Sequence, residues 1–256
     1  MTHPPDPTGR MPRRAFLTGM SIVAVGACAP SQVPPARSAP ALAPIQPAGS
    51  PPAPTATGSA TELVRAASPR PEVALTFHGA GDPGLASRVL GCLADRGAAA
   101  TVLAVGQWLQ QYPDVPKMIS DYGHELGNHT WSHPDLAMMD EAEVRVEIER
   151  CRDRIAAATG GPGAFFRPSA AQHATDMVLR GAAAAGYPRV LSYDVDSRDF
   201  TDPGAAAIRR NVATGAAGSV VSMHLGHPGT LAALSGVLDD LAARGLRPVT
   251  ASRLFG

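Results

Sequence analysis

Two histidines four residues apart are the first feature of this sequence that could do chemistry. They open and close the segment His129-Thr130-Trp131-Ser132-His133. Residues at positions i and i+4 share one face of a helical turn, so both imidazoles could bind one metal ion. The spacing alone is weak evidence, because an ordinary helix surface carries the same pattern. A metal site therefore requires further polar residues that the fold brings close to His129 and His133.

Further chemically capable residues come at or just after the ends of apolar runs. Apolar runs bounded by turn residues are typical of buried strands. The polar residues in this position are His78, Asp82, His129, His133, Arg167, Asp194, Asp196, Asp199 and His224. In a parallel sheet or barrel, the carboxyl ends of the strands share one face, where ligands bind. The pattern therefore predicts that these side chains gather on one face.

The elements that must position these residues alternate between strand and helix. The apolar runs predict strands at residues 73–77, 99–105, 124–128, 164–167, 189–193, 219–224 and 247–249. Helices are predicted from Pro83 to just before Gly97, and over 141–158, 174–185, 203–213 and 230–243, with a last turn near 250–254. Asp140 is the expected N-cap of the second of these helices, and Gly160 its expected end.

Alternating strands and helices favour an α/β fold with a parallel sheet. The alternating region has about 185 residues, which is short for an eight-unit barrel of about 250. A shortened or distorted barrel of parallel strands fits this length better than a doubly wound sheet, although the sequence leaves its closure open. Trp108 and Phe165 are expected in the core. No glycine-rich phosphate loop opens a helix.

Composition excludes several classes of function. The 256 residues carry 22 Lys plus Arg and 22 Asp plus Glu, which excludes a strongly basic nucleic-acid surface. Three cysteines cannot form a disulfide scaffold, and we expect Cys92 and Cys151 to be buried thiols. No apolar run reaches the ~20 residues of a transmembrane helix.

The first 69 residues are predicted to export and tether the protein. Residues 1–28 combine Arg13-Arg14, a short apolar stretch and small residues, as in a twin-arginine export signal. The end of this stretch, Val25-Gly26-Ala27-Cys28, resembles a bacterial lipobox, in which the cysteine is acylated. Residues 29–69 are rich in Pro and Ala and almost uncharged, so we expect a disordered spacer. The predicted catalytic domain is 70–256.

A longer string around the two histidines is far more specific than their spacing. GHELGNHTWSHPDL (residues 123–136) closely resembles the second motif of the polysaccharide deacetylases, the NodB-homology domain of carbohydrate esterase family 4. ALTF (74–77), FFRP (165–168), DVDSRDF (194–200) and VSMH (221–224) resemble the first, third, fourth and fifth motifs in the family's order. The resemblance implies a distorted (β/α)7 barrel that removes N-acetyl or O-acetyl groups from a glycan.

The resemblance also implies roles for single residues. The two histidines would bind the catalytic metal, Zn²⁺ or another divalent transition metal. His224 would protonate the leaving nitrogen, Asp199 would keep His224 charged, and Arg167 would orient the base carboxylate. A main-chain N–H near Ala170 would stabilise the oxyanion. Such a site accounts for the activated water, polarised carbonyl and acid that amide hydrolysis needs.

The first motif departs from the family pattern. Where the family has Thr-Phe-Asp-Asp-Gly-Pro, with a base and then a metal ligand, this chain has Thr-Phe-His78-Gly79-Ala80-Gly81-Asp82-Pro83. Three interpretations follow. Asp82 reaches back as the third ligand with His78 as base; His78 is the ligand and Asp82 the base; or the site is a degraded, glycan-binding relic. The first is our working prediction, with Asp82, His129 and His133 as ligands and His224, Asp199, Arg167 and His78 as catalytic residues.

Two further departures affect the substrate. The third motif continues Ser169-Ala170-Ala171 in place of Pro-Tyr-Gly, and Phe200 stands where the family has Trp. We expect a monomeric, zinc-dependent carbohydrate deacetylase that acts on a cell-wall or extracellular glycan, most simply an N-acetyl hexosamine polymer. It would have no nucleic-acid partner and would contact the membrane only through its lipid anchor. The alternatives are an inert glycan-binding domain and a deacetylase of small amides.

Overall fold

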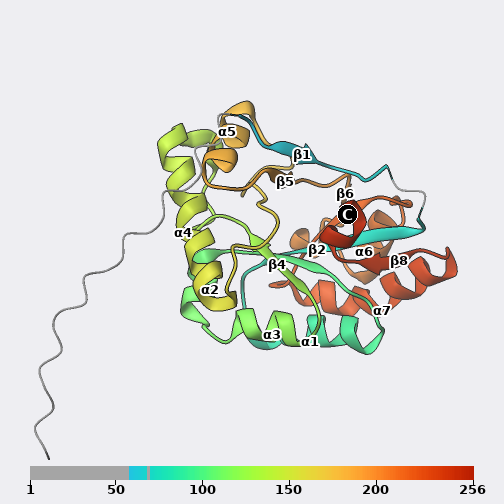
Figure 1. Ribbon diagram of the computed structural model, residues 1–256. Helices are drawn as coiled ribbons and strands as arrows, with labels where there is room; N and C mark the ends of the chain where they lie inside the picture. The colour runs from blue at the N-terminus through green and yellow to red at the C-terminus, as the bar shows by residue number, and fades with distance from the viewer. Residues whose placement is uncertain (1–57, 68–69) are drawn as a thin grey trace, which may run out of the picture. The chain divides into compact units, whose positions relative to one another are not determined.

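A parallel sheet built around strand β2 (Glu72–Gly79) organises the protein (Figure 1). The computed structural model describes residues 58–67 and 70–256. β2 lies between β3 (Thr101–Ala104) and β7 (Val220–His224), with β4 (Glu125–Asn128) beyond β3 and β6 (Val195–Asp196) beyond β7. β8 (Arg247–Val249) pairs with the first residues of β2. All of these pairs are parallel.

A second, shorter pair of strands extends the architecture. β1 (Thr61–Leu63) runs parallel to β5 (Arg189–Leu191). Single bridges from Asn128 to Phe166 and from Phe166 to Val190 link β4 to β5. The predicted α/β fold with parallel strands is confirmed, although the strand ladders of the described residues do not form a closed ring.

Helices follow the strands and cover the outside of the sheet (Figure 1). They are α1 (Pro83–Asp95), α2 (Gly106–Gln111), α3 (Val115–Asp121), α4 (Glu141–Thr159), α5 (Asp176–Ala184), α6 (Ala205–Val212), α7 (Pro228–Ala243) and α8 (Ala251–Phe255), with 3-10 turns η1 (Leu136–Met138) and η2 (Asp199–Thr201). Asp140 and Glu143 form a capping box at the start of α4, and Gly160 ends it with φ of 81°. Both ends of this helix agree with the sequence-based prediction.

Several elements differ from those predicted. In the predicted strand 164–167, only Phe166 forms strand bridges, one to Asn128 and one to Val190. The sequence analysis omitted α2, α3, β1 and β6, which are too short to show a periodic pattern. β1 lies inside the stretch 29–69 that composition predicted as a spacer, so the folded part begins before residue 70.

The core fills the space between sheet and helices. Trp108 and Phe165 are buried, as predicted. Cys92 and Cys151 are free thiols. Cys151 is buried as expected, which raises its pKa to about 12, whereas Cys92 is only partly buried. The predicted export signal 1–28, Cys28 and most of the spacer lie outside the described residues. Within the described part of the chain, none of the helices is long and apolar enough to cross a membrane.

Candidate active site

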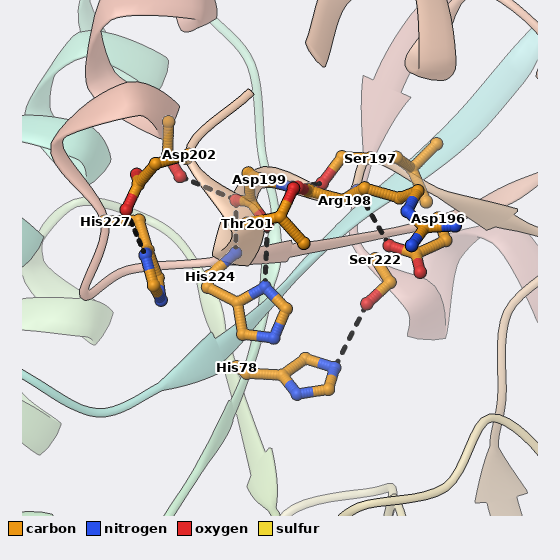
Figure 2. Close-up of polar contacts among 12 residues, drawn as sticks. His78, Asp196, Ser197, Arg198, Asp199, Thr201, Asp202, Ser222, His224 and His227 are labelled. Atoms are coloured by element: carbon orange, nitrogen blue, oxygen red, sulfur yellow. Dashed lines mark hydrogen bonds and ion pairs between the residues drawn. The ribbon is translucent and has the colours of Figure 1, made fainter. Parts of the chain in front are cut away.

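His78 and His224 lie side by side because β2 and β7 pair in register. The register places His78 directly opposite His224, near the carboxyl ends of both strands. Their ring centroids are 4.4 Å apart, and Figure 2 shows the two imidazoles facing each other. Parallel pairing thus brings together two residues that are 146 positions apart in the sequence, as the strand-end pattern predicted.

His129 and His133 follow the end of β4 in an irregular turn, not in the helical turn that their spacing suggested. Thr130 and His133 adopt left-handed backbone conformations, with φ of 67° and 60°. Such conformations persist in residues other than glycine only where the surroundings fix them. Buried Glu147 on α4 provides this fixation, since its carboxylate accepts hydrogen bonds from the main-chain N–H groups of Trp131 and Ser132 at 3.0 and 2.8 Å.

The hydrogen bonding of His129 prepares it to bind a metal. Its Nδ1 lies 3.0 Å from the main-chain oxygen of Arg167, which can only accept, so Nδ1 carries the proton. Nε2 is then an unprotonated lone-pair donor, and it is buried without a hydrogen-bond partner. Burial, with the charge of His133, holds the pKa of His129 well below its usual range. Neutral imidazole with one nitrogen held by a carbonyl is the form that ligates metals.

Three histidines converge at this point. One ring nitrogen from each of His78, His129 and His133 lies within 4.8 Å of the other two. The Nε2 atom of His78 is 3.1 Å from the hydroxyl oxygen of Ser222, a neighbour on β7 (Figure 2). Burial, with the charge of His129, keeps the pKa of His78 well below its usual range. The structure therefore brings His78, which the working prediction made a base, into the group of potential ligands.

The side chain of Asp82 caps a helix in this structure and does not point to a role as metal ligand. Its Oδ2 accepts a hydrogen bond from the main-chain N–H of Leu85 at 2.8 Å and so caps helix α1. Asp82 is not in the converging group of His78, His129 and His133. The role of Asp82 as the third ligand stays a prediction, and the geometry favours the alternative in which His78 is the ligand.

Gly79, at the family's metal-ligand position, has no room for a side chain. A Cβ atom there would lie 2.9 Å from Cγ1 of Val102 and 3.0 Å from a ring carbon of Trp108. Successive side chains of a strand point to opposite faces, so His78 faces the site and Gly79 faces the core. A carboxylate at this position would be forced into apolar packing.

Buried Asp199 and partly exposed His224 form a hydrogen-bonded pair. Nδ1 of His224 donates to Oδ1 of Asp199 at 2.7 Å, and Oδ2 of Asp199 accepts from the His224 main chain and from the Thr230 hydroxyl at 2.8 and 2.6 Å. Burial raises the pKa of Asp199, but these hydrogen bonds and the charge of His224 bring the net pKa below its ordinary value. The pair leaves Nε2 of His224 as the ring nitrogen free to exchange a proton.

The Arg167 side chain is completely buried and donates hydrogen bonds to main-chain carbonyl groups after Val190. Its Nε donates to the carbonyl of Leu191 at 2.7 Å and its Nη2 to that of Ser192 at 3.3 Å. Burial lowers its pKa to about 9. Among the ion pairs of the described residues, none joins Arg167 to a carboxylate. Arg167 thus fixes the end of β5 and offers its own carbonyl to His129, and its role in orienting a base carboxylate stays a prediction.

A pocket of about 360 Å³ opens over these residues. Its lining consists of His78, His133, Ala170, Ala171, Gln172, Tyr193, Asp196, Phe200 and His224. The exposed ring of Phe200 packs edge-on to His224 with ring centroids 5.3 Å apart. Asp194 lies apart from the pocket lining, because its carboxylate accepts from Ser219 and from the main chain of Val220. Of the other predicted strand-end residues, His78, His133, Asp196 and His224 line the pocket, and His129, Arg167 and Asp199 contact lining residues. Asp82 is not part of this lining, because it caps α1.

Sequence reasoning missed Ser222, Thr230, Glu147 and Tyr193. The sequence did contain a signal for Ser222: it precedes His224 by two residues, so both side chains lie on the same face of β7. Glu147 had none, since it contacts the histidine turn from helix α4, 15 or more residues further along the chain.

Comparison with known proteins identifies the family. Residues 65–190 match the polysaccharide deacetylase family. Over 188 residues the chain is 33% identical to a peptidoglycan-N-acetylglucosamine deacetylase of Bacillus cereus, covering 72% of this chain and 87% of that protein. The chain belongs to the polysaccharide deacetylase family. The predicted resemblance to this family is thereby confirmed.

Solved structures of this family share the fold. A peptidoglycan N-acetylglucosamine deacetylase superposes with a TM-score of 0.71 at 28% identity, covering 76% of this chain and 92% of that chain. A pseudoenzyme of carbohydrate esterase family 4 from Bacillus anthracis, BA3943, superposes with a TM-score of 0.72 at 25% identity, covering 77% and 69%. The fold is therefore shared by a named deacetylase and by a protein described as a pseudoenzyme.

Proposed function

We propose that this protein is a metal-dependent hydrolase that removes acetyl groups from an N-acetyl hexosamine glycan of the cell wall. The observation that carries the proposal is the convergence of three imidazoles, one with a buried, unpartnered Nε2, beside the Asp199–His224 pair. Family membership and the 33% identical peptidoglycan-N-acetylglucosamine deacetylase support the glycan substrate.

The donor set fits a divalent transition metal such as Zn²⁺. His78, His129 and His133 would hold it, and three neutral imidazoles are a known ligand set of catalytic zinc. Since Ser222 occupies Nε2 of His78, the nitrogen of that ring available to a metal is Nδ1. When bound, the metal would supply Lewis-acid polarisation of the acetyl carbonyl and of water.

His224 moves the protons of the reaction. His78, His129 and His133 are assigned to the metal, which leaves His224 as the base. Nε2 of His224 takes a proton from the attacking water as the water oxygen bonds to the acetyl carbon. The same Nε2 then gives the proton to the sugar nitrogen as the C–N bond breaks, which releases acetate and the free amine. Asp199 holds the ring through Nδ1, so that Nε2 faces the pocket throughout.

The main chain of the third motif completes the site. Ala170 has φ of 55° and borders the pocket. An N–H group of this segment would hydrogen-bond to the acetyl oxygen as negative charge develops there. Phe200 would pack against the sugar or its acetyl methyl group.

Release of acetate tests this function. Purified protein with one equivalent of Zn²⁺ should release acetate from N-acetylglucosamine oligomers, while the His129→Ala variant should not. A parallel assay with acetylated xylan separates N- from O-deacetylation. The second candidate, an inert glycan-binding domain, is favoured by the altered first motif and by the likeness to a pseudoenzyme. Glycan binding by zinc-loaded protein without acetate from either substrate would contradict hydrolysis and support that candidate.

We also propose that the protein acts outside the cell membrane as a monomer, exported by the twin-arginine route and held by a lipid on Cys28. The peptidoglycan substrate of its relative supports an extracellular site of action. Replacement of Arg13 and Arg14 by lysine should block export. Cys28→Ala should release the protein from membranes, and a Cys28→Ala variant that stays membrane-bound would contradict lipid anchoring.

A further inference from the structure

One wall of the pocket is an exposed loop. Ala170, Ala171 and Gln172 contribute to the lining, and the residues from Ala170 to His173 are exposed to solvent. Ala170 has φ of 55°, a left-handed conformation that costs energy in a residue other than glycine. A strained and exposed wall requires contacts from elsewhere that hold it in place.

The carboxylate of Glu62 provides such contacts. Its Oε1 accepts hydrogen bonds from the main-chain N–H of Ala174 at 2.8 Å and from the hydroxyl of Ser192 at 2.6 Å, and Nδ1 of His173 lies 3.3 Å away. Three hydrogen-bond donors therefore surround Oε1 of Glu62, next to the end of the loop at Ala174. Two of them belong to the loop, and the third follows β5, which precedes the pocket residue Tyr193.

Glu62 is itself held by the short strand β1. The N–H of Thr61 donates to the carbonyl of Pro188 at 2.9 Å, and the N–H of Ser192 donates to that of Leu63 at 2.9 Å. β1 precedes the residues that match the family, which begin at Arg65. An element outside the family's motifs therefore reaches the pocket wall through a single side chain.

We propose that Glu62 is a positioning residue for substrate binding, because its carboxylate fixes the 170–174 loop as one wall of the pocket. The inference rests on the proposed function, since it assigns the loop to the glycan. The hydrogen bonds of the Glu62 carboxylate go to the loop and to Ser192 after β5, so its loss should weaken glycan binding while the histidine group and His224 keep their arrangement.

Three variants separate this role from general stability. Glu62→Ala removes the acceptor. Glu62→Gln keeps an oxygen in its place, and Thr61→Ala alters an exposed neighbour on the same strand. The readouts are amide hydrogen exchange of the peptide spanning 169–175, zinc content, and KM and kcat for N-acetylglucosamine oligomers.

Glu62→Ala should raise loop exchange and increase KM about tenfold, because the loop loses its charge-assisted hydrogen bonds to the carboxylate. Zinc content and kcat should stay near wild type, Glu62→Gln should recover most of KM, and Thr61→Ala should match wild type. If the protein releases no acetate, loop exchange and glycan affinity still decide the role of Glu62. Unchanged loop exchange and unchanged glycan affinity in Glu62→Ala would overturn the proposal, as would equal losses in Glu62→Ala and Thr61→Ala.

Discussion

Oδ1 of Asp199 lies 2.7 Å from Nδ1 of His224, and the same carboxylate also accepts from the main chain of His224. The carboxylate is completely buried, whereas the imidazole borders the pocket. The pair therefore fixes both the orientation of the ring and the nitrogen that faces substrate.

Replacement of Asp199 by Asn should lower kcat by about 10²–10⁴-fold, because His224 loses the carboxylate that orients its ring and stabilises its protonated form. Zinc content should not change, since Asp199 is not in the converging histidine group. Asp202→Asn is the matched control, because Asp202 pairs with His227 at 3.6 Å and neither residue lines the pocket. Steady-state kinetics and metal analysis check both variants, and equal activity of Asp199→Asn and Asp202→Asn would contradict the role of the pair.

Ser222→Ala should weaken zinc affinity by about 10–100-fold, the usual effect of removing a hydrogen bond that orients a ligating histidine. The hydroxyl of Ser222 is 3.1 Å from Nε2 of His78, and the substitution frees that ring to rotate. Ser235→Ala, on the exposed side of α7, is the control. Competition with a chelating dye measures the affinity. Equal zinc affinities in the two variants would show that Ser222 does not position His78.

Gly79→Asp should not rebuild the family's metal ligand. The space around Gly79 is filled by Val102, Ala104 and Trp108, so even Gly79→Ala should destabilise the fold by about 1–3 kcal/mol through overpacking. The aspartate variant should lose more, because it buries a carboxylate among apolar groups. Urea denaturation of both variants measures these losses. A Gly79→Asp protein of wild-type stability with tighter zinc binding would refute this packing argument.

Buried Glu72 makes the stability of the fold depend on acid pH. Burial raises its pKa, but hydrogen bonds from Arg247 and Arg253 and the charges of Arg253 and Arg70 lower it, and the net pKa lies below 4.5. A carboxylate with a depressed folded pKa stabilises the fold above its unfolded pKa, and this contribution is lost as pH falls through the folded value.

Glu72→Gln should therefore be less stable than wild type at pH 7, and the difference in unfolding free energy should shrink as pH falls below 4.5. Denaturant titrations of both proteins between pH 7 and pH 3 measure the difference. A difference in unfolding free energy that is constant over this pH range would show that the ionised carboxylate of Glu72 does not stabilise the fold.

The sequence predicted the parallel α/β class and most residues of the pocket, because strand periodicity and strand-end position depend only on local pattern. It could not predict the tertiary contacts that determine which residues bind the metal. Asp82 directly before Pro83 is a local pattern typical of a helix N-cap, and Asp82 does cap α1. Whether a bound metal would draw this carboxylate to the histidines depends on tertiary geometry, which a local pattern does not contain. β1 was assigned to the spacer because three residues show no periodicity, and its stability comes from pairing with β5, more than 120 residues away.

In the metal site that we propose, His78 and not a carboxylate is the third ligand beside His129 and His133. Zinc per chain in purified His78→Ala and Asp82→Ala proteins, reconstituted and dialysed side by side, tests it most directly. Asp82→Ala loses a helix cap worth about 1 kcal/mol, so circular dichroism should first confirm that both variants are folded. We predict that Asp82→Ala keeps about one zinc and that His78→Ala falls well below one. Loss of zinc in Asp82→Ala with full occupancy in His78→Ala would contradict the claim.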